Sequence, residues 1–339
     1  MREYIRSALE DLDLPENCVT TFDDWCVQFY ERSIGRRLPW NASAKQPDYS
    51  AIRATVRRHL AGRKIFEAVM VDEGQDLPAE DISFLAGISG HVTVAMDRRQ
   101  QIYEAGSGEP EILQALGIRK GDVALLEAFR CSEYVVRLAC EFLPDPRERA
   151  AFLCQARASF TDLETPLLYL ASDFEDEKLR LLEVLRERQL ADRSVAILFP
   201  LKRQVEGFAQ WLREEGFEVE TRKSGLDFDS PRPKLLTIHS AKGLTFDSVL
   251  LPGLVEPSFP GSLQERRERL LYVAITRATR WIYLSAVEGG QIPELERLHR
   301  LAGTAAVPLT LAHAGPGEMR ARKKALPTAP VAEDDLAIL

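Results

Sequence analysis

The sequence predicts an α/β protein with two parallel-sheet domains, and three observations support this. Short apolar runs recur along the chain, and the run at 68–71 ends abruptly in acidic residues, which is typical of a buried parallel strand. Stretches with helical periodicity separate these runs, as in doubly wound sheets. The length of 339 residues suits two domains of ordinary size.

The alternation of strands and helices can be followed in order through the first half. We expect the following segments: a helix over 1–17, a short strand at 18–22, a helix opening at Asp23, a loop over 36–50, a helix over 49–64, a strand at 68–71, a helix through 82–85, and strands at 91–96 and 123–127. A helix running to about 143 then leads into the second half.

The pattern starts again after about residue 165. We expect strands at 165–172, 195–199, 217–219, 234–239, 247–251 and 281–285, with helices at 173–190, 204–215 and 266–278. The expected domains are therefore 1–128 and 129–301. Residues 302–339 are rich in Pro, Gly and Ala, first basic and then acidic, and without periodicity, so we expect a disordered tail.

Composition narrows the class of protein. Apolar residues make up 45% and charged residues 28%, as in globular proteins, and no run is long enough to span a membrane. The five cysteines form no CxxC pair, which favours reduced thiols and a cytoplasmic protein. With a net charge of −8, binding to nucleic acid would need a local basic surface.

The acidic pair Asp72-Glu73 directly follows the strand at 68–71, with Asp76 close behind. In open α/β sheets ligands bind at the carboxyl ends of the strands, and two acids there could hold the Mg²⁺ of a nucleotide. A solvated acidic turn is the alternative that this stretch alone leaves open.

Five blocks follow one another in a definite order. They are VDEGQDL (71–77), DRRQQIY (97–103), LEAFRCS (126–132), TIHSAKGLTFD (237–247) and ERLLYVAITRA (268–278). Together they resemble motifs II to VI of superfamily 1 DNA helicases of the UvrD/Rep/PcrA type, over about residues 1–290. The resemblance implies two RecA-like domains of the P-loop NTPase type, the first incomplete at its N-terminus. It also implies ATP and Mg²⁺ as cofactors, single-stranded DNA as partner and 3′→5′ translocation.

The same resemblance assigns roles at a nucleotide site. It implies that Asp72 holds Mg²⁺ with Glu73, that Glu73 polarises the attacking water, and that Gln100 senses the γ-phosphate. Phe129 would stack on adenine, while Arg130 and Arg277 would reach the γ-phosphate. The alternatives are a surface role for Gln100, and a helix cap or interdomain salt bridge for each arginine.

Other residues match positions that face nucleic acid in the family. They are Thr21, Phe22, Tyr103, Thr237, His239 and Lys242. His239 could instead be a packed histidine at the end of a strand. The Thr21-Phe22 block is followed by Asp23-Asp24, which would repel phosphates.

One element of the family is missing: no GxxxxGK[ST] phosphate loop occurs in the sequence. Without its backbone amides and lysine, we expect ATP affinity and turnover to collapse. The chain would then be a truncated or split helicase that needs a phosphate loop from elsewhere, and a second polypeptide is one possible source. The alternative is a non-catalytic DNA-binding or partner subunit that keeps the helicase fold.

Overall fold

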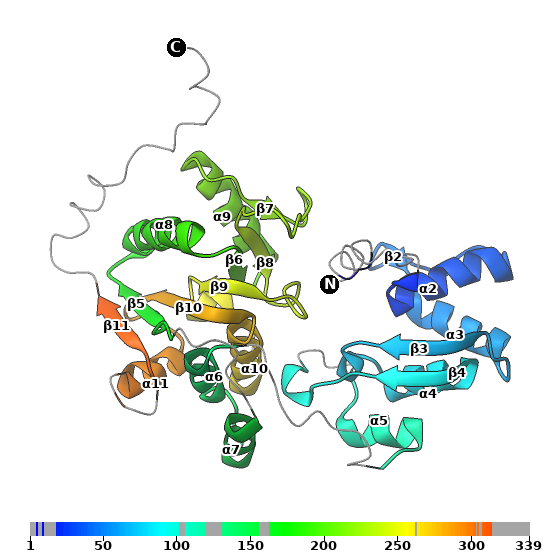
Figure 1. Ribbon diagram of the computed structural model, residues 1–339. Coiled ribbons are helices and arrows are strands. Elements are labelled where there is room, and N and C mark those ends of the chain that lie inside the picture. Colours follow the sequence, from blue (N-terminus) through cyan, green and yellow to red (C-terminus); the bar gives the residue numbers. More distant parts are fainter. Residues whose placement is uncertain are drawn as a thin grey trace. The chain divides into compact units, whose positions relative to one another are not determined.

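A computed structural model provides the structure of the protein (Figure 1). It describes Ile5, Leu9 and residues 18–101, 106–119, 131–155, 163–261, 263–302, 304 and 307–313. The chain divides into two compact units, unit 1 at Met1–Ala124 and unit 2 at Leu125–Leu339. This division lies four residues before the boundary expected from the sequence, and each unit is described separately below.

Unit 1 is a small α/β unit. Its described elements are α2 (Phe22–Phe29), the π-helical turn η2 (Tyr30–Ile34), β1 (Trp40–Asn41), β2 (Gln46–Pro47), α3 (Tyr49–Leu60), β3 (Phe66–Val71), the 3₁₀ turn η3 (Gly74–Asp76), α4 (Ala79–Ile88), β4 (Ser89–Val94), η4 (Arg98–Gln100) and α5 (Glu109–Leu116). The strand expected at 18–22 is absent, because Thr21 caps α2 and Phe22 already belongs to the helix. The loop expected over 36–50 contains the short antiparallel pair β1–β2.

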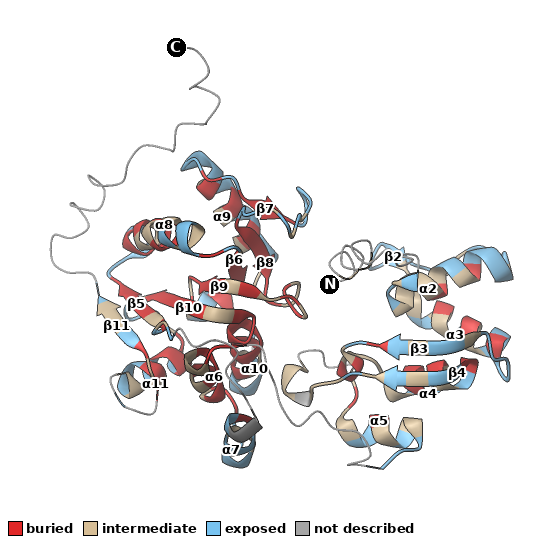
Figure 2. Cartoon of the chain, viewed as in Figure 1, coloured by how far each residue is buried: buried red, intermediate tan, exposed pale blue. Residues whose placement is uncertain are grey.

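β3 and β4 form a two-stranded parallel sheet, which is the centre of unit 1. Val69 pairs in register with Val92, and Val71 with Val94, and all four contribute to the core that the helices cover. The opposite side of β3 is open: the side chain of Met70 is 85% exposed. Within the described residues, neither strand pairs with a third strand. Most of the core of unit 1 therefore comes from its helices (Figure 2).

Unit 2 is built on a seven-stranded sheet. Its described elements are α6 (Glu133–Cys140), α7 (Pro146–Gln155), β5 (Leu167–Ala171), α8 (Phe174–Ala191), β6 (Val195–Phe199), α9 (Lys202–Glu214), β7 (Glu220–Thr221), β8 (Lys234–Thr237), β9 (Phe246–Leu251), η5 (Glu256–Ser258), α10 (Gln264–Ile275), β10 (Ala278–Val287), α11 (Pro293–Leu301) and β11 (Thr310–His313). The strand order is β11-β5-β10-β9-β6-β8-β7, and every neighbouring pair is parallel.

Helices cover both faces of this sheet. Figure 1 shows α8 and α9 on one face and α6, α10 and α11 on the other. A sheet covered on both faces needs strands that are apolar throughout, and all five residues of β6 are buried. Figure 2 shows β8 buried throughout, and β9 and β10 buried along most of their length. The α/β fold class expected from the sequence is confirmed.

The edge strand β7 lies at Glu220–Thr221 and not at 217–219, where the sequence predicts it. The reason is the end of α9. Gly216 takes a left-handed conformation with φ 84°, and Phe217 donates its backbone N–H to the carbonyl of Leu212. Phe217 is thus used to close the helix and to pack into the core, before the strand begins.

The expectation of a disordered tail from residue 302 is wrong for residues 310–313, which form the strand β11. β11 pairs in parallel with β5, with Thr310 opposite Leu167 and His313 opposite Leu170. Val307 and Leu309 are buried beside it, so two apolar side chains anchor a segment whose composition resembles a linker. Residues 314–339 lie outside the described part of the chain. No described helix combines the length and the apolar character needed to cross a membrane.

Candidate functional site

The carboxyl ends of β3 and β4 bring together the residues that the sequence assigns to a nucleotide. Asp72 and Glu73 follow β3, while Gln100 lies in the turn η4 that follows β4. The parallel ladder continues beyond the strands, because Ala95 donates its N–H to Val71 O and Gly74 donates to Ala95 O, both at 2.8 Å. The two turns are therefore held side by side.

Glu73 has an unusual backbone conformation. Its φ of 53° and ψ of 43° are left-handed, and among the described non-glycine residues only Lys45 shares a positive φ. Such a conformation costs about 1–3 kcal/mol and persists where the surroundings enforce it. Here the N–H of Glu73 donates to Asp72 Oδ1 at 2.9 Å. At the next position only glycine fits, because a Cβ on Gly74 would lie 2.2 Å from Val94 Cγ1.

The buried side chain at the centre of this turn is Gln75, to which sequence reasoning assigned no role. Its Nε2 donates to Glu73 Oε2, and its Oε1 accepts from the N–H of Asp97 at 3.1 Å. Asp97 in turn accepts from Gln100 Nε2 at 3.1 Å. A signal was available: a polar amide lies inside the acidic block, directly after a buried strand.

The acids of this turn have the donors that Mg²⁺ prefers. The carboxylate of Asp72 is exposed and that of Glu73 half-buried. Mg²⁺ is usually held by one or two carboxylates together with substrate phosphates and water, and the exposed carboxylate of Asp72 next to Glu73 fits that pattern. The described residues contain no cluster of three or more His, Cys, Asp or Glu side chains arranged to hold a metal alone.

In unit 2, Arg277 lies at the start of β10 with its side chain fully buried. Nε donates to Val273 O at 3.0 Å, Nη1 to Leu244 O at 3.3 Å and Nη2 to Thr276 Oγ1 at 3.1 Å. In this arrangement the guanidinium joins the end of α10 to the turn after β8. The side chain expected to reach a phosphate therefore lies inside unit 2.

The end of β8 and the turn after it carry three of the six residues expected to contact nucleic acid, Thr237, His239 and Lys242. The Thr237 hydroxyl points into the turn, donating to Ser240 Oγ at 2.9 Å and accepting from Ser240 N at 3.1 Å. The pKa of His239 is lowered below its ordinary value, mainly by burial and further by the positive charges of Arg266 and Lys242. The charged groups of the exposed Arg266 and the buried Lys242 thus lie near the half-buried ring of His239 at the carboxyl end of β8, and we call these three residues the β8 cationic cluster.

Thr21 and Phe22 serve the packing of unit 1. Thr21 Oγ1 accepts from Asp24 N at 3.1 Å and so caps α2. The ring of Phe22 stacks on Trp25 with centroids 6.1 Å apart, and the guanidinium of Arg53 lies 5.4 Å above it. Asp23, which the sequence suggests would repel phosphates, is paired with Arg53 at 2.7 Å. The expected sites Tyr103, Phe129 and Arg130 lie outside the described residues.

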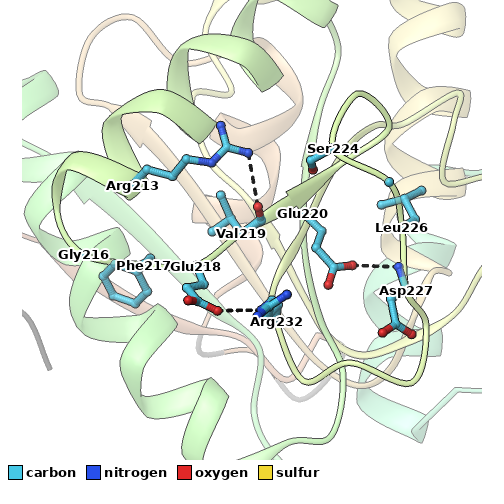
Figure 3. Close-up of a pocket in the computed structure, with 11 residues that line it drawn as sticks. Arg213, Gly216, Phe217, Glu218, Val219, Glu220, Ser224, Leu226, Asp227 and Arg232 are labelled. Atoms are coloured by element: carbon cyan, nitrogen blue, oxygen red, sulfur yellow. Dashed lines mark hydrogen bonds and ion pairs between the residues drawn. The ribbon is translucent and has the colours of Figure 1, made fainter. Parts of the chain in front are cut away.

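A cavity of about 670 Å³ lies elsewhere in unit 2, between the end of α9 and the loop after β7. Figure 3 shows three contacts among the residues that line it: Arg213 donates to Val219 O, Glu218 pairs with Arg232, and Glu220 accepts from Asp227 N. None of the residues singled out from the sequence lines this cavity.

Comparisons with known proteins agree with this picture. Residues 220–289 match the UvrD-like helicase C-terminal domain. The probable DNA helicase of Mycoplasma pneumoniae is 27% identical over 241 residues, which cover 65% of this chain and 43% of that protein. DNA helicase II of Haemophilus influenzae is 42% identical over 74 residues, and that of Escherichia coli is 40% identical over 75 residues; each match covers 20% of this chain and 10% of the relative.

Among solved structures, the C-terminal domain of a possible DNA helicase from Lactobacillus plantarum is similar at 21% identity with a TM-score of 0.40, covering 54% of this chain and 98% of that one. That likeness is too distant to carry an argument. This chain spans less than half the length of the curated relatives described above.

Proposed function

We propose that this chain, which is similar to UvrD-like DNA helicases, contributes one part of an ATP-driven, 3′→5′ translocating DNA helicase whose phosphate loop is supplied from outside residues 1–339. One observation carries the proposal: Asp72, Glu73 and Gln100 are gathered at the joined ends of β3 and β4, while the sequence contains no phosphate-loop motif. The site has the acids of a nucleotide centre without the cradle that binds phosphates.

Each residue in the gathered turns has a chemical task in this proposal. The exposed carboxylate of Asp72 would hold Mg²⁺, which supplies neutralisation of phosphate charge when it is bound. Glu73 would accept a hydrogen bond from the attacking water and orient it. The amide of Gln100 would contact the γ-phosphate, for which its donor and acceptor ends are both suited.

The segment that carries the phosphate loop would complete unit 1. The described part of this unit has only two strands in its sheet, and one side of β3 is open at Met70. Parallel sheets in nucleotide-binding proteins are covered on both faces, so further structure is expected there. A strand followed by a glycine-rich loop would supply both the cover and the missing backbone amides.

In unit 2, the β8 cationic cluster is the part of the proposed DNA surface that the described residues support best. Lysine, arginine and imidazole groups donate to phosphate oxygens, and the overall charge of −8 makes a local cluster necessary. Thr237 would act mainly by shaping the turn that presents it. The proposal also places the protein in the cytoplasm, where its thiols would stay reduced.

A non-catalytic DNA-binding or partner subunit is the second candidate function. The observation that favours it is the internal placement of Arg277, whose guanidinium is already bonded to three acceptors within unit 2. An arginine finger would have to leave these acceptors. If Arg277 is purely structural, the family fold is kept while hydrolysis is lost.

The test is ATP hydrolysis by the purified chain with and without single-stranded DNA, together with DNA binding. We expect phosphate release at background level from the wild type, Asp72→Asn and the control Glu187→Gln, which changes an exposed acid on α8. Release that depends on DNA and is lost only in Asp72→Asn would show that the chain needs no added phosphate loop.

Two further results separate the candidates. A GxxxxGK[ST] motif in the reading frame upstream of Met1, whose co-expressed product restores hydrolysis, would support the split enzyme. DNA binding without hydrolysis under any of these conditions would support the binding subunit. Failure to bind single-stranded DNA would contradict both candidates.

A further inference from the structure

We propose that Gln75 is a positioning residue that ties Glu73 to the turn carrying Gln100. The tie is a chain of hydrogen bonds: Gln100 Nε2 to Asp97 Oδ2, Asp97 N to Gln75 Oε1, and Gln75 Nε2 to Glu73 Oε2. The assignment of a water-polarising role to Glu73 rests on the proposed function. The tie itself rests only on the contacts of unit 1.

The chemistry of the glutamine side chain is what the tie needs. One end of the side chain must donate, because it faces the Glu73 carboxylate, and the other end must accept, because it faces the Asp97 N–H. Glutamine supplies a donor and an acceptor at the required spacing. Glutamate would keep the acceptor for Asp97 but lose the donor for Glu73, and leucine would lose both.

Burial makes the tie strong. The Gln75 side chain is 0% exposed, so water cannot easily replace either partner when the amide is removed. An unsatisfied buried polar group is costly, and the N–H of Asp97 would become one. The amide therefore has one preferred orientation, set by both of its neighbours.

The backbone around Gln75 also leaves it little room to move. A Cβ on Gly106 would lie 2.0 Å from Gln75 O, and one on Gly74 would lie 2.2 Å from Val94 Cγ1. Both glycines thus mark close approaches of the chain on either side of the turn. Glu73, with its left-handed backbone, lies in the chain between Asp72 and the closely packed Gly74.

The consequence is that two strand ends are positioned together. A displacement of the turn at 97–100, which carries the expected γ-phosphate sensor, acts on the Asp97 N–H and through Gln75 on the carboxylate of Glu73. The described hydrogen bonds give this coupling a direct path of three contacts. In the acidic block Asp-Glu-Gly-Gln, Gln75 follows Glu73 by two positions, and this spacing lets its amide donate to the Glu73 carboxylate.

The test is hydrogen exchange in the full chain, measured by NMR on the Asp97 backbone amide and on the Gln75 side-chain amide. In Gln75→Leu, exchange of the Asp97 amide should accelerate about tenfold or more, because its acceptor is gone. In Gln75→Glu, which keeps an acceptor oxygen and nearly the same shape, this amide should stay protected. The controls Gln28→Leu and Gln28→Glu change an exposed glutamine on α2 and should leave Asp97 unaffected.

A second measurement keeps the test valid if Gln75→Leu fails to fold. In Glu73→Ala the side-chain amide protons of Gln75 lose their acceptor, and their exchange should also accelerate about tenfold. Unchanged exchange of the Gln75 amide in Glu73→Ala, or of the Asp97 amide in a folded Gln75→Leu, would overturn the tie. Neither readout uses ATP, so failure of an added phosphate-loop segment to restore hydrolysis would count against the proposed function and leave the tie standing.

Discussion

Arg277 donates a hydrogen bond from Nη1 to the carbonyl oxygen of Leu244 at 3.3 Å, which links the start of β10 to the turn that follows β8. The same side chain holds Val273 O and Thr276 Oγ1 at the end of α10. One buried guanidinium thus organises two of the sequence blocks by which the family is recognised. Its contribution to stability can be separated from any role toward a phosphate.

Arg277→Ala should lower the free energy of unfolding by about 3 kcal/mol, because it leaves a cavity and unsatisfied buried acceptors. Urea denaturation followed by circular dichroism measures this. Arg266→Ala, which removes an exposed arginine on α10, should change stability by no more than about 0.5 kcal/mol. Equal stabilities for Arg277→Ala and the wild type would mean that the side chain is not anchored inside unit 2.

Asp81 should be the most sensitive acid of unit 1. Its carboxylate is fully buried and pairs with Arg53 at 2.8 Å and with Arg57. Asp81→Ala leaves both arginines without this partner and should cost about 3 kcal/mol. Glu80→Ala, a matched control on the same helix, removes an exposed partner of Arg57 and should cost at most about 1 kcal/mol. Similar losses from the two variants in urea denaturation would contradict this ranking.

Binding of single-stranded DNA should depend on pH through His239. Its pKa lies below the ordinary value of 6.5 in the free protein, because burial and the nearby cations disfavour the charged ring. Phosphates would raise that pKa, so binding takes up a proton and the affinity should increase several-fold as the pH falls from about 8 to about 6. Fluorescence anisotropy of a labelled oligonucleotide measures this.

The matched controls for this experiment are His239→Asn and His91→Asn. The first should flatten the dependence on pH, and the second, an exposed histidine on β4, should keep it. For the free protein the sign is opposite: the lowered pKa makes the folded state bind fewer protons, so the stability contributed by neutral His239 is lost as the pH falls below 6.5. An affinity with no pH dependence in the wild type would remove His239 from the DNA surface.

The thiols should differ sharply in reactivity. Burial raises the pKa of Cys26 to about 12, so almost no thiolate forms near neutral pH, whereas Cys18 is exposed. In a Cys154→Ser background, iodoacetamide should modify Cys18 first and leave the buried Cys26, Cys131 and Cys140 unmodified until the protein is denatured. Mass spectrometry after timed labelling locates each modified thiol. Early labelling of Cys26 would show that α2 does not pack as described.

Much of the fold could be predicted from local patterns. Buried parallel strands are apolar throughout, so runs such as 195–199 can be identified as strands from the sequence. The strand expected at 68–71 is part of β3, and the acids that follow it lie at its carboxyl end. Where a residue could belong either to a strand or to the end of a helix, the sequence pattern does not show which role it takes. Phe217 has the pattern of a strand residue but closes a helix, and that choice depends on the left-handed Gly216 before it.

The candidate site was only partly predictable, for a related reason. Motif resemblance identifies which side chains are present, but not which way they point. Arg277 was expected at a phosphate and lies inside unit 2, because three acceptors are available to it there. Gln75 was overlooked because its importance arises from burial and from Asp97, a residue 22 positions away in the chain.

The strand β11 has a practical consequence for producing this protein. Composition alone suggests ending the chain after Leu301, at the start of what looks like a linker. Such a shortened protein would lose Val307, Leu309 and the whole of β11, and β5 would become a bare sheet edge. Bare edges recruit strands from other molecules. Versions that retain residues to at least His313 should therefore stay monodisperse at concentrations where the shorter ones precipitate.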